Sequence, residues 1–342
     1  EIKMGRFILR RLLASILIIL VIIFVNFIIL RLTPGDPYTI GQIQAIQANK
    51  GRPLTAAQQA SLAELRQSVT IYLDPWPEAF TRWLGNIVRF DWGNSVTTRY
   101  PIGPQLTQAA LSSLWLLLMA LGLGAGLGIP LGIYAALRRG TWKDKVIQFS
   151  SVIFTTLPGW FFLVIFTYLN QQIWALSGKT FTLQPVRDSL GNPLNGFFLM
   201  AEQGWHTFLP IFFLAATFLA LFSAQARSQT LEVLNEDYVR TARAKGLPVR
   251  RVMLWHIFRN SLQPLVSILG GLIPFVFGAQ MLIENAGYWS GLGNLFLGSA
   301  HGRDYTTLMG IFTILAAACV LTSFLADIAY GLIDPRVREE LK

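Results

Sequence analysis

The sequence predicts an all-α, polytopic membrane protein with about six transmembrane helices. Of its 342 residues, 53% are hydrophobic and only 13% are charged. Soluble domains carry about 25% charged residues, roughly twice that fraction. The apolar residues gather in runs long enough to span a bilayer, and the basic residues lie beside these runs. Composition and clustering therefore both indicate a membrane domain.

The first expected span covers residues 12–30, an apolar run broken only by Ser15 and Asn26. A helix of this length rises about 28 Å, close to the thickness of the hydrocarbon core. Four basic residues precede it: Lys3, Arg6, Arg10 and Arg11. The positive-inside rule therefore places the N-terminus in the cytoplasm. The run is too long for the apolar core of a signal peptide and no cleavage site follows, so we expect an uncleaved span.

Residues 33–108 are expected to form a long external segment. Residues 38–70 are rich in Gln and Ala and are expected to be helical. Between Trp76 and Asp91, apolar residues recur at spacings of three and four: Phe80, Trp83, Leu84, Ile87 and Val88. This spacing predicts an amphipathic helix. It suits two roles: lying at the outer membrane interface with Trp as anchor, which we favour, or contacting a solute-delivering protein.

Five further spans are expected, over residues 109–137, 146–170, 207–226, 262–284 and 307–333. The connections between spans two and three and between four and five are basic, as is the segment after span six. These basic residues are Arg138, Arg139, Lys143 and Lys145, seven from Arg227 to Arg259, and Arg336 and Arg338. They lie on the same side as the N-terminus, so both termini are expected in the cytoplasm. We expect 1–108 to form the first helix plus external segment, and 109–342 a core with five spans.

Glycine and proline punctuate these spans. Gly124, Gly128 and Gly132 share one helix face, which favours close packing against another helix in lipid. Pro158-Gly159 interrupts the third span, and the fifth is interrupted by Pro264, Gly270-Gly271, Pro274 and Gly278. Such breaks suit a span that lines a pathway or moves, and they equally suit a static kink.

A few polar residues inside the spans are candidates for function. The candidate pathway residues are Asn26, Phe275, Gln280 and Glu284. Glu284 equally suits the outer boundary of its span. Asp327 would be costly against lipid, so we expect it at the cytoplasmic interface or paired with a basic residue.

Residues 230–248 predict a short, punctuated helix near 236–246. Asn235 is expected to cap its N-terminus, with Glu236 and Asp237 in the first turn. Gly246 suits the position just past the helix end, and Pro248 blocks continuation. A helix of about ten residues is marginal alone in water. It is either a docking element for a partner or a loop helix resting on lipid.

Tyr238 to Leu247 read Tyr-Val-Arg-Thr-Ala-Arg-Ala-Lys-Gly-Leu. This stretch resembles the cytoplasmic loop, the EAA loop, of binding-protein-dependent ABC importer permeases, in their peptide/nickel branch. In that family the helix is a coupling helix, which fits a groove on the ATPase subunit. The resemblance implies coupling contacts by Asp237, Tyr238, Arg240, Thr241, Ala242, Arg243, Ala244, Lys245 and Gly246. Thr241-Ala242-Arg243 stand where the older consensus has Glu-Ala-Ala.

The resemblance covers nearly the whole chain. Its further motifs are Arg31-Leu32-Thr33-Pro34-Gly35-Asp36-Pro37, Asp91-Trp92-Gly93-Asn94-Ser95, Gly291-Leu292-Gly293, Arg303-Asp304-Tyr305, and Asp327 with Tyr330 and Asp334-Pro335-Arg336. Ser290 stands where the family usually has Pro. The pattern is similar to that of the B-type subunit of a dipeptide or oligopeptide importer. It implies the fold of a type I ABC importer permease.

The resemblance also implies a function and an assembly. The chain would be a permease subunit in the bacterial cytoplasmic (inner) membrane that translocates peptides by alternating access. Its partners would be a homologous second permease subunit, two ABC ATPases, an extracytoplasmic substrate-binding protein and membrane lipid. ATP and magnesium would belong to the ATPases, with no cofactor in this chain. A nickel-chelate or glutathione importer permease of the same family is the alternative.

Other functions are disfavoured by what the sequence lacks. The net charge of +10 reflects the basic flanks of the spans, so no nucleic acid partner is expected. Cys319 is the single cysteine and the three histidines are far apart, so no metal site is expected. No GxxxxGK[ST] motif occurs, and no catalytic set lies within the spans, so the chain itself is not expected to be an enzyme. A secondary transporter would need intramembrane ionisable relays, which the spans lack.

Overall fold

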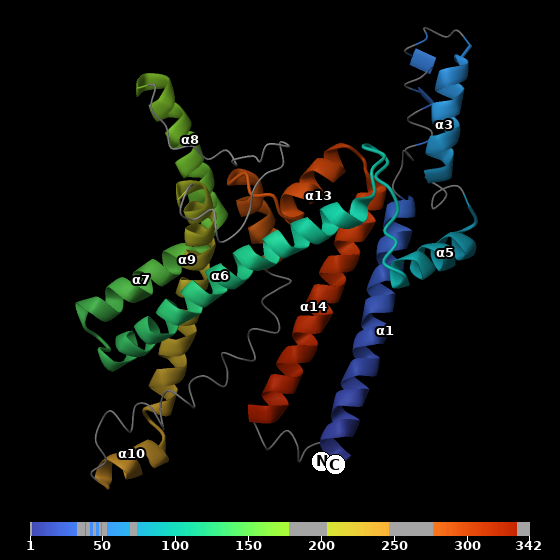
Figure 1. Ribbon diagram of the computed structural model, residues 1–342. Helices are drawn as coiled ribbons and strands as arrows, with labels where there is room; N and C mark the ends of the chain where they lie inside the picture. Colours follow the sequence, from blue (N-terminus) through green and yellow to red (C-terminus); the bar gives the residue numbers. More distant parts are fainter. Residues whose placement is uncertain are drawn as a thin grey trace. The chain divides into compact units, whose positions relative to one another are not determined.

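The computed structural model describes residues 2–32, 53–68, 74–177, 204–245 and 276–333, with isolated positions between 38 and 49. Every regular element in these residues is a helix, which confirms the all-α prediction (Figure 1). The helices are α1 (Ile2–Leu32), α3 (Ala56–Ser68), α5 (Trp76–Val88), α6 (Ile102–Leu137), α7 (Trp142–Thr156), α8 (Gly159–Ser177), α9 (Gly204–Val233), α10 (Asp237–Ala244), α13 (Leu292–His301) and α14 (Tyr305–Ile333). A further helical segment covers 276–286.

Four described helices are long and apolar enough to cross a membrane: Ile8–Ile29, Ile102–Leu137, Phe208–Val233 and Tyr305–Ile328. They correspond to the first, second, fourth and sixth predicted spans. The third predicted span is the pair α7 and α8, which are bent by 81° at their junction. Most of the fifth, 262–284, lies outside the described residues.

The break between α7 and α8 falls at Pro158, as the sequence predicted. The backbone N–H of Gly159 donates to the Thr217 hydroxyl at 3.1 Å, so α9 satisfies a backbone group freed by the break. A Cβ at position 159 would overlap the carbonyl oxygen of Phe213. Gly159 therefore lets α8 begin directly against α9. The predicted interruption at Gly278 is wrong, because Gly278 lies inside the helical segment 276–286 and the backbone there stays helical.

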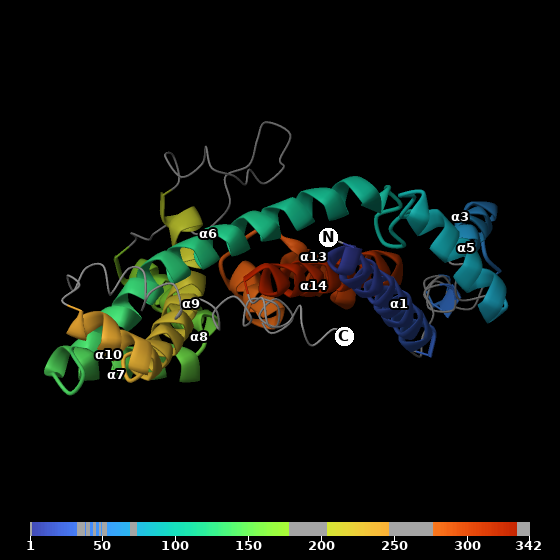
Figure 2. The same ribbon diagram turned by 90° about the horizontal axis from the view of Figure 1, so that it is seen from below.

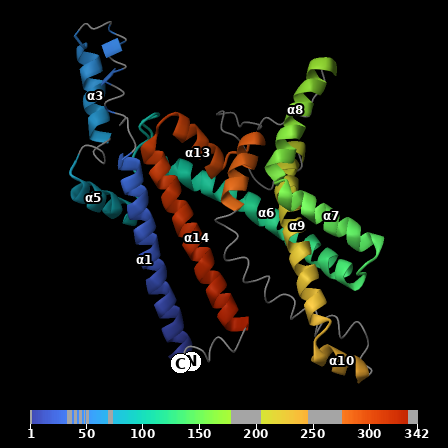
Figure 3. The same ribbon diagram turned by 180° about the vertical axis from the view of Figure 1, so that it is seen from behind.

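The chain folds into two units, each assembled from segments that are distant in sequence. The first comprises Glu1–Arg11, Ser112–Asn294 and Leu321–Lys342, and the second comprises Leu12–Leu111 and Leu295–Val320. In the first unit α9 packs against both α7 and α8 (Figure 3). The core of this unit includes the fully buried side chains of Leu116, Leu163, Leu214 and Phe218. Helix α9 is thus the central element of the first unit.

The glycine face of α6 packs closely against another helix, as predicted, and that helix is α9. A Cβ on Gly128 would lie 2.7 Å from the Leu219 carbonyl oxygen. A Cβ on Gly124 would overlap the Cβ of Phe218, and one on Gly132 would overlap the Ser223 carbonyl oxygen. Since real Cβ atoms do not approach so closely, these positions admit only glycine at the observed helix separation.

In the second unit, α5 packs its apolar face on α1. The ring of Phe80 lies 5.3 Å from that of Phe27, which is 1% exposed. Phe24 of α1 contacts both Phe80 and Trp76 edge to face. The amphipathic helix is therefore confirmed, but its apolar face is covered in part by the chain itself. Phe80 is partly buried by these contacts, and the expected role of the rest of the face, toward lipid or a solute-delivering protein, stays a prediction.

Asp304 joins two segments of the second unit that are far apart in sequence. Its carboxylate accepts from the Ser95 hydroxyl at 2.5 Å and from the backbone N–H of Val96 at 3.2 Å. It also accepts from the Thr307 hydroxyl and N–H, so it caps the N-terminus of α14. Two motifs noted in the sequence, Asp91–Ser95 and Arg303–Tyr305, therefore meet at one buried carboxylate.

Candidate functional site

Helix α10 is attached to the end of α9 by a tight connection. Only residues 234–236 separate the two helices, and α10 turns across the end of α9 (Figures 1 and 2). Backbone hydrogen bonds bridge the turn, from Leu234 N–H to the Thr230 carbonyl and from Glu236 N–H to the Val233 carbonyl. Because the connection is short and hydrogen-bonded, a displacement of α10 must pull on the end of α9.

The start of α10 differs from the prediction. Helix α9 continues to Val233, seven residues past residue 226, where the fourth predicted span ends. Asn235 then lies within reach of the last turn of α9, and its side-chain N–H donates to the Leu231 carbonyl oxygen at 3.0 Å. It therefore satisfies a free carbonyl of α9 rather than capping α10. The observed α10 has eight residues, with Asp237 in its first turn.

The described side chains of α10 divide into one buried position and an exposed face. Val239 is fully buried, whereas Asp237, Tyr238, Thr241, Ala244 and Lys245 are exposed. The Thr241 hydroxyl donates to the Asp237 carbonyl within the helix. Of the other predicted coupling residues, Gly246 and the side chains of Arg240, Ala242 and Arg243 lie outside the described residues. Helix α10 is thus anchored through Val239 and presents its other described side chains outward.

An ion pair close to α10 was not predicted from the sequence. Arg227 of α9 donates from Nε to Asp144 Oδ1 at 2.7 Å and from Nη2 to Oδ2 at 3.0 Å. Asp144 lies in the first turn of α7, and its side chain is 2% exposed. It also accepts from the Gln148 amide at 2.9 Å and from the Gly140 N–H at 3.0 Å. Both carboxylate oxygens are therefore fully engaged.

The sequence did carry a local signal for Asp144. It is the one acidic residue in the strongly basic connection between the second and third predicted spans. Thr141, three residues earlier, is the N-cap of α7 and accepts from the Asp144 N–H. Thr-x-x-Asp is close to a capping pattern at a helix start. Nothing local identifies its partner, because Arg227 lies 83 residues away.

Of the predicted pathway residues, Gln280 and Glu284 contact each other, whereas Asn26 belongs to the other unit. Asn26 is partly buried in α1, and Phe275 lies outside the described residues. Gln280 and Glu284 are 4% and 0% exposed, so neither lines an open path in this structure. The alternative placement of Glu284 at the outer boundary of its span stays a prediction, and its carboxylate is enclosed by protein.

Glu284 instead organises a buried hydrogen-bond network. Its carboxylate accepts from the Ser113 hydroxyl at 2.6 Å, the Gln280 amide at 2.9 Å and the Gly293 N–H at 2.6 Å. The same serine hydroxyl accepts from the Leu292 N–H at 2.7 Å. A Cβ on Gly291 would overlap this carboxylate. The Gly-Leu-Gly motif thus forms a backbone cradle around Glu284 at the start of α13.

Asp327 has a basic partner, which was one of its two predicted settings. Its carboxylate lies 3.0 Å from a guanidinium nitrogen of Arg11, and the two side chains are 36% and 50% exposed. This pair belongs to the same unit as Asp144–Arg227 and has the same chemistry. It differs because both of its side chains are more exposed than those of Asp144 and Arg227.

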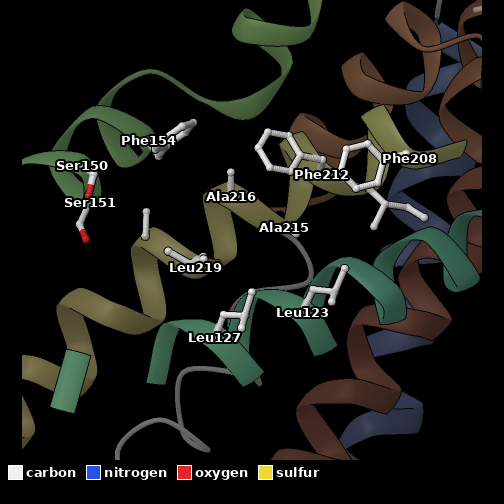
Figure 4. Close-up of a pocket in the computed structure, with 12 residues that line it drawn as sticks. Leu123, Leu127, Ser150, Ser151, Phe154, Phe208, Phe212, Ala215, Ala216 and Leu219 are labelled. Atoms are coloured by element: carbon white, nitrogen blue, oxygen red, sulfur yellow. The ribbon is translucent and has the colours of Figure 1, made fainter. Parts of the chain in front are cut away.

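One groove lies between α6, α7 and α9 in the first unit. It has a volume of about 360 Å³. Leu123 and Leu127 come from α6, Phe154 from α7, and Phe208 and Phe212 from α9 (Figure 4). Its walls are apolar apart from two serines of α7. Within the described part of the chain, no group of three or more His, Cys, Asp or Glu side chains is placed to hold a metal ion.

Comparisons with known proteins agree over nearly the full length. Residues 128–339 match the family described as the binding-protein-dependent transport system inner membrane component. The oligopeptide transport system permease protein AppB of Bacillus subtilis (strain 168) is 34% identical over 98% of this chain and 99% of its own. The dipeptide transport system permease protein DppB of Escherichia coli (strain K12) is 30% identical over 98% of this chain and 100% of its own. The di/tripeptide transport system permease protein DppB of Pseudomonas aeruginosa (strain UCBPP-PA14) is also 30% identical, with the same coverage.

Proposed function

The chain belongs to the family of binding-protein-dependent transport system inner membrane components, and we propose that it is the peptide-translocating permease subunit of an ATP-driven importer. It is an all-α, multi-pass inner-membrane protein and a permease subunit. Similar proteins in three bacteria carry names that specify oligopeptides, dipeptides, or di- and tripeptides. That agreement supports peptides as the substrate class of this chain.

The importer would contain four kinds of component. This chain pairs with a homologous second permease subunit, and an extracytoplasmic binding protein delivers the peptide. Two ABC ATPases bind ATP with magnesium and hydrolyse it, so ATP chemistry occurs outside this chain. Both termini and α10 lie in the cytoplasm, where the ATPases are.

The observation that carries this proposal is the short attachment of α10 to α9. Helix α10 presents Tyr238, Thr241 and Ala244 outward and is held through buried Val239. An ATPase that binds this face and moves α10 also displaces α9, because the two helices are joined only by the short, hydrogen-bonded connection 234–236. Helix α9 in turn packs on α7 and α8, which meet at the 81° bend. The ATPases bind the two states of the permease unequally, and that difference drives alternating access.

The test places a charge on the exposed face of α10. Ala244→Glu should leave the chain in the membrane but reduce ATP-dependent peptide uptake at least about tenfold, a loss within the usual range of coupling between sites. The matched control is Ala57→Glu, which puts the same side chain on an exposed alanine of α3. Uptake by proteoliposomes and co-purification of the ATPases are measured on the same preparations.

Two results would count against the proposal. Normal uptake by Ala244→Glu would show that α10 makes no coupling contact. Uptake of a nickel chelate or glutathione in place of di- and oligopeptides by the wild-type assembly would overturn the substrate class while keeping the permease role.

A further inference from the structure

We propose that the Asp144–Arg227 ion pair is a positioning link that passes the displacement of α10 from α9 into α7. This inference rests on the proposed function, since it assumes that the ATPases move α10. It assigns a transmission role to two residues that lie outside α10, in α7 and α9.

The first step is the position of Arg227 on α9. It lies six residues before Val233, the last residue of α9, so about 9 Å of helix separates it from the connection to α10. An α-helix of this length is stiff, because its backbone hydrogen bonds fix every turn. A shift or rotation of α10 therefore reaches Arg227 almost undiminished.

The second step is the geometry of the pair. A two-point contact between a planar guanidinium and a carboxylate permits a narrow range of mutual orientations. Asp144 is held on the α7 side by Gln148 and by the Gly140 N–H, so it cannot follow a moving arginine by rotating freely. Motion of Arg227 is consequently passed to the first turn of α7.

The third step is what else connects α7 with α9. The apolar groove of about 360 Å³ separates parts of the two helices, with Phe154 on one wall and Leu219 on another (Figure 4). Side-chain packing between α7 and α9 is therefore interrupted at the groove, although the two helices pack against each other elsewhere. A second polar contact, between the hydroxyls of Ser151 and Ser223 at 2.7 Å, lies further along the two helices. These two polar contacts thus hold α7 on α9 at defined positions, and of the two the ion pair lies nearer to α10 along α9.

The energetics indicate that the ion pair fixes the relative position of α7 and α9 more than it stabilises the fold. Removing a carboxylate and a guanidinium from water has a free-energy cost that offsets much of the attraction between them. Apolar residues of similar volume often stabilise such a site equally well. An ion pair with a defined two-point geometry instead selects one register of the two helices.

The test uses Arg227→Lys in the full assembly with the ATPases, the second permease and the binding protein. Lysine keeps the charge but lacks the planar fork. The ATPases should still co-purify at the wild-type level. The number of ATP molecules hydrolysed per peptide imported should rise about five- to tenfold, as expected for the loss of coupling between two sites.

Two further variants separate transmission from stability. Arg11→Lys makes the same change in the exposed pair with Asp327 and should leave the ATP-to-peptide ratio unchanged. The double variant Asp144→Leu/Arg227→Met replaces the pair by apolar side chains and should assemble, yet it should show the raised ratio. This second variant decides the matter if Arg227→Lys fails to assemble.

A wild-type ratio in Arg227→Lys or in the assembled apolar variant would overturn the link and leave the proposed function standing. An equal increase in the ATP-to-peptide ratio in Arg227→Lys and Arg11→Lys would also overturn the link. The increase would then not depend on which of the two ion pairs is changed. Absence of ATP-dependent uptake by the wild-type assembly would instead refute the proposed function itself.

Discussion

Asp144 and Glu284 are two buried carboxylates of the same unit, and they are stabilised in different ways. Asp144 has a guanidinium partner, together with an amide and one backbone N–H. The described contacts of Glu284 include a hydroxyl, an amide and the backbone N–H groups of Gly293 and Asn294 at the start of α13. The partial positive charge of that helix N-terminus favours the carboxylate in place of a full cation.

The difference bears on how each site tolerates motion. The Asp144 contact joins a side chain of α7 to a side chain of α9, and its two-point geometry passes motion from one helix to the other. The Glu284 contact reaches the backbone of Gly293 directly and is enclosed by Gly291, so it holds the start of α13 in one place. We therefore regard Asp144–Arg227 as a link between two helices and the Glu284 network as a fixed anchor.

The largest expected effect is that of Glu284→Ala. It leaves the Gly293 N–H and the Gln280 amide without their buried acceptor and opens a cavity, so we expect roughly 3–5 kcal/mol of destabilisation. Thermal unfolding of the detergent-purified chain, with the fraction eluting as a folded species, measures this. A melting temperature equal to that of the wild type would show that the network contributes little.

Asp144→Ala is expected to lower the free energy of unfolding by less, about 2 kcal/mol. The reason is that Arg227 is partly exposed and can reach water once unpaired. The same unfolding measurement applies. If Asp144→Ala lowers the melting temperature more than Glu284→Ala does, the expected order of the two contributions to stability is wrong.

Adding one methyl group to the Glu284 cradle, with Gly293→Ala, should cost about 1–3 kcal/mol. A Cβ at position 293 would lie 2.9 Å from the Glu284 carboxylate and would overlap the Met281 backbone. The control is Gly298→Ala, also in α13, where a Cβ meets nothing within 4 Å. This control should be neutral or slightly stabilising, because alanine favours helix. Equal melting temperatures for the two variants would contradict the cradle.

The smallest change in the free energy of unfolding is expected for Arg11→Ala, within about 0.5 kcal/mol, because exposed ion pairs contribute little to stability. Its partner Asp327 is 36% exposed and keeps access to its surroundings. A loss as large as that of Asp144→Ala would show that burial does not distinguish the two pairs.

Local patterns in the sequence were enough for much of the fold. Apolar runs and their basic flanks predicted the membrane helices, since the bilayer sets helix length regardless of the partner helices. The shared face of Gly124, Gly128 and Gly132 predicted close packing, and Pro158 predicted the break between α7 and α8. These features depend on backbone geometry and spacing within one helix, which the sequence expresses directly.

The contacts at the candidate sites could not be predicted in this way. The pattern around Asn235 predicts a helix cap, but its amide bonds to α9 because that helix runs further than its apolar stretch. The apolar face of α5 is typical of a surface for lipid, but Phe80 meets Phe27 of α1.

The sequence by itself determined that this chain is a helical membrane protein, where most of its described spans lie, and that a short helix follows the fourth span. It also displayed the motifs that place the chain in its family. Only the tertiary structure decided that Arg227 pairs with Asp144 and that Glu284 is enclosed by Gly291 and Gly293. The physical reason is that helix formation depends on neighbours within a few residues, whereas a buried charge is satisfied by whichever side chain or backbone group the packing of distant helices brings to it.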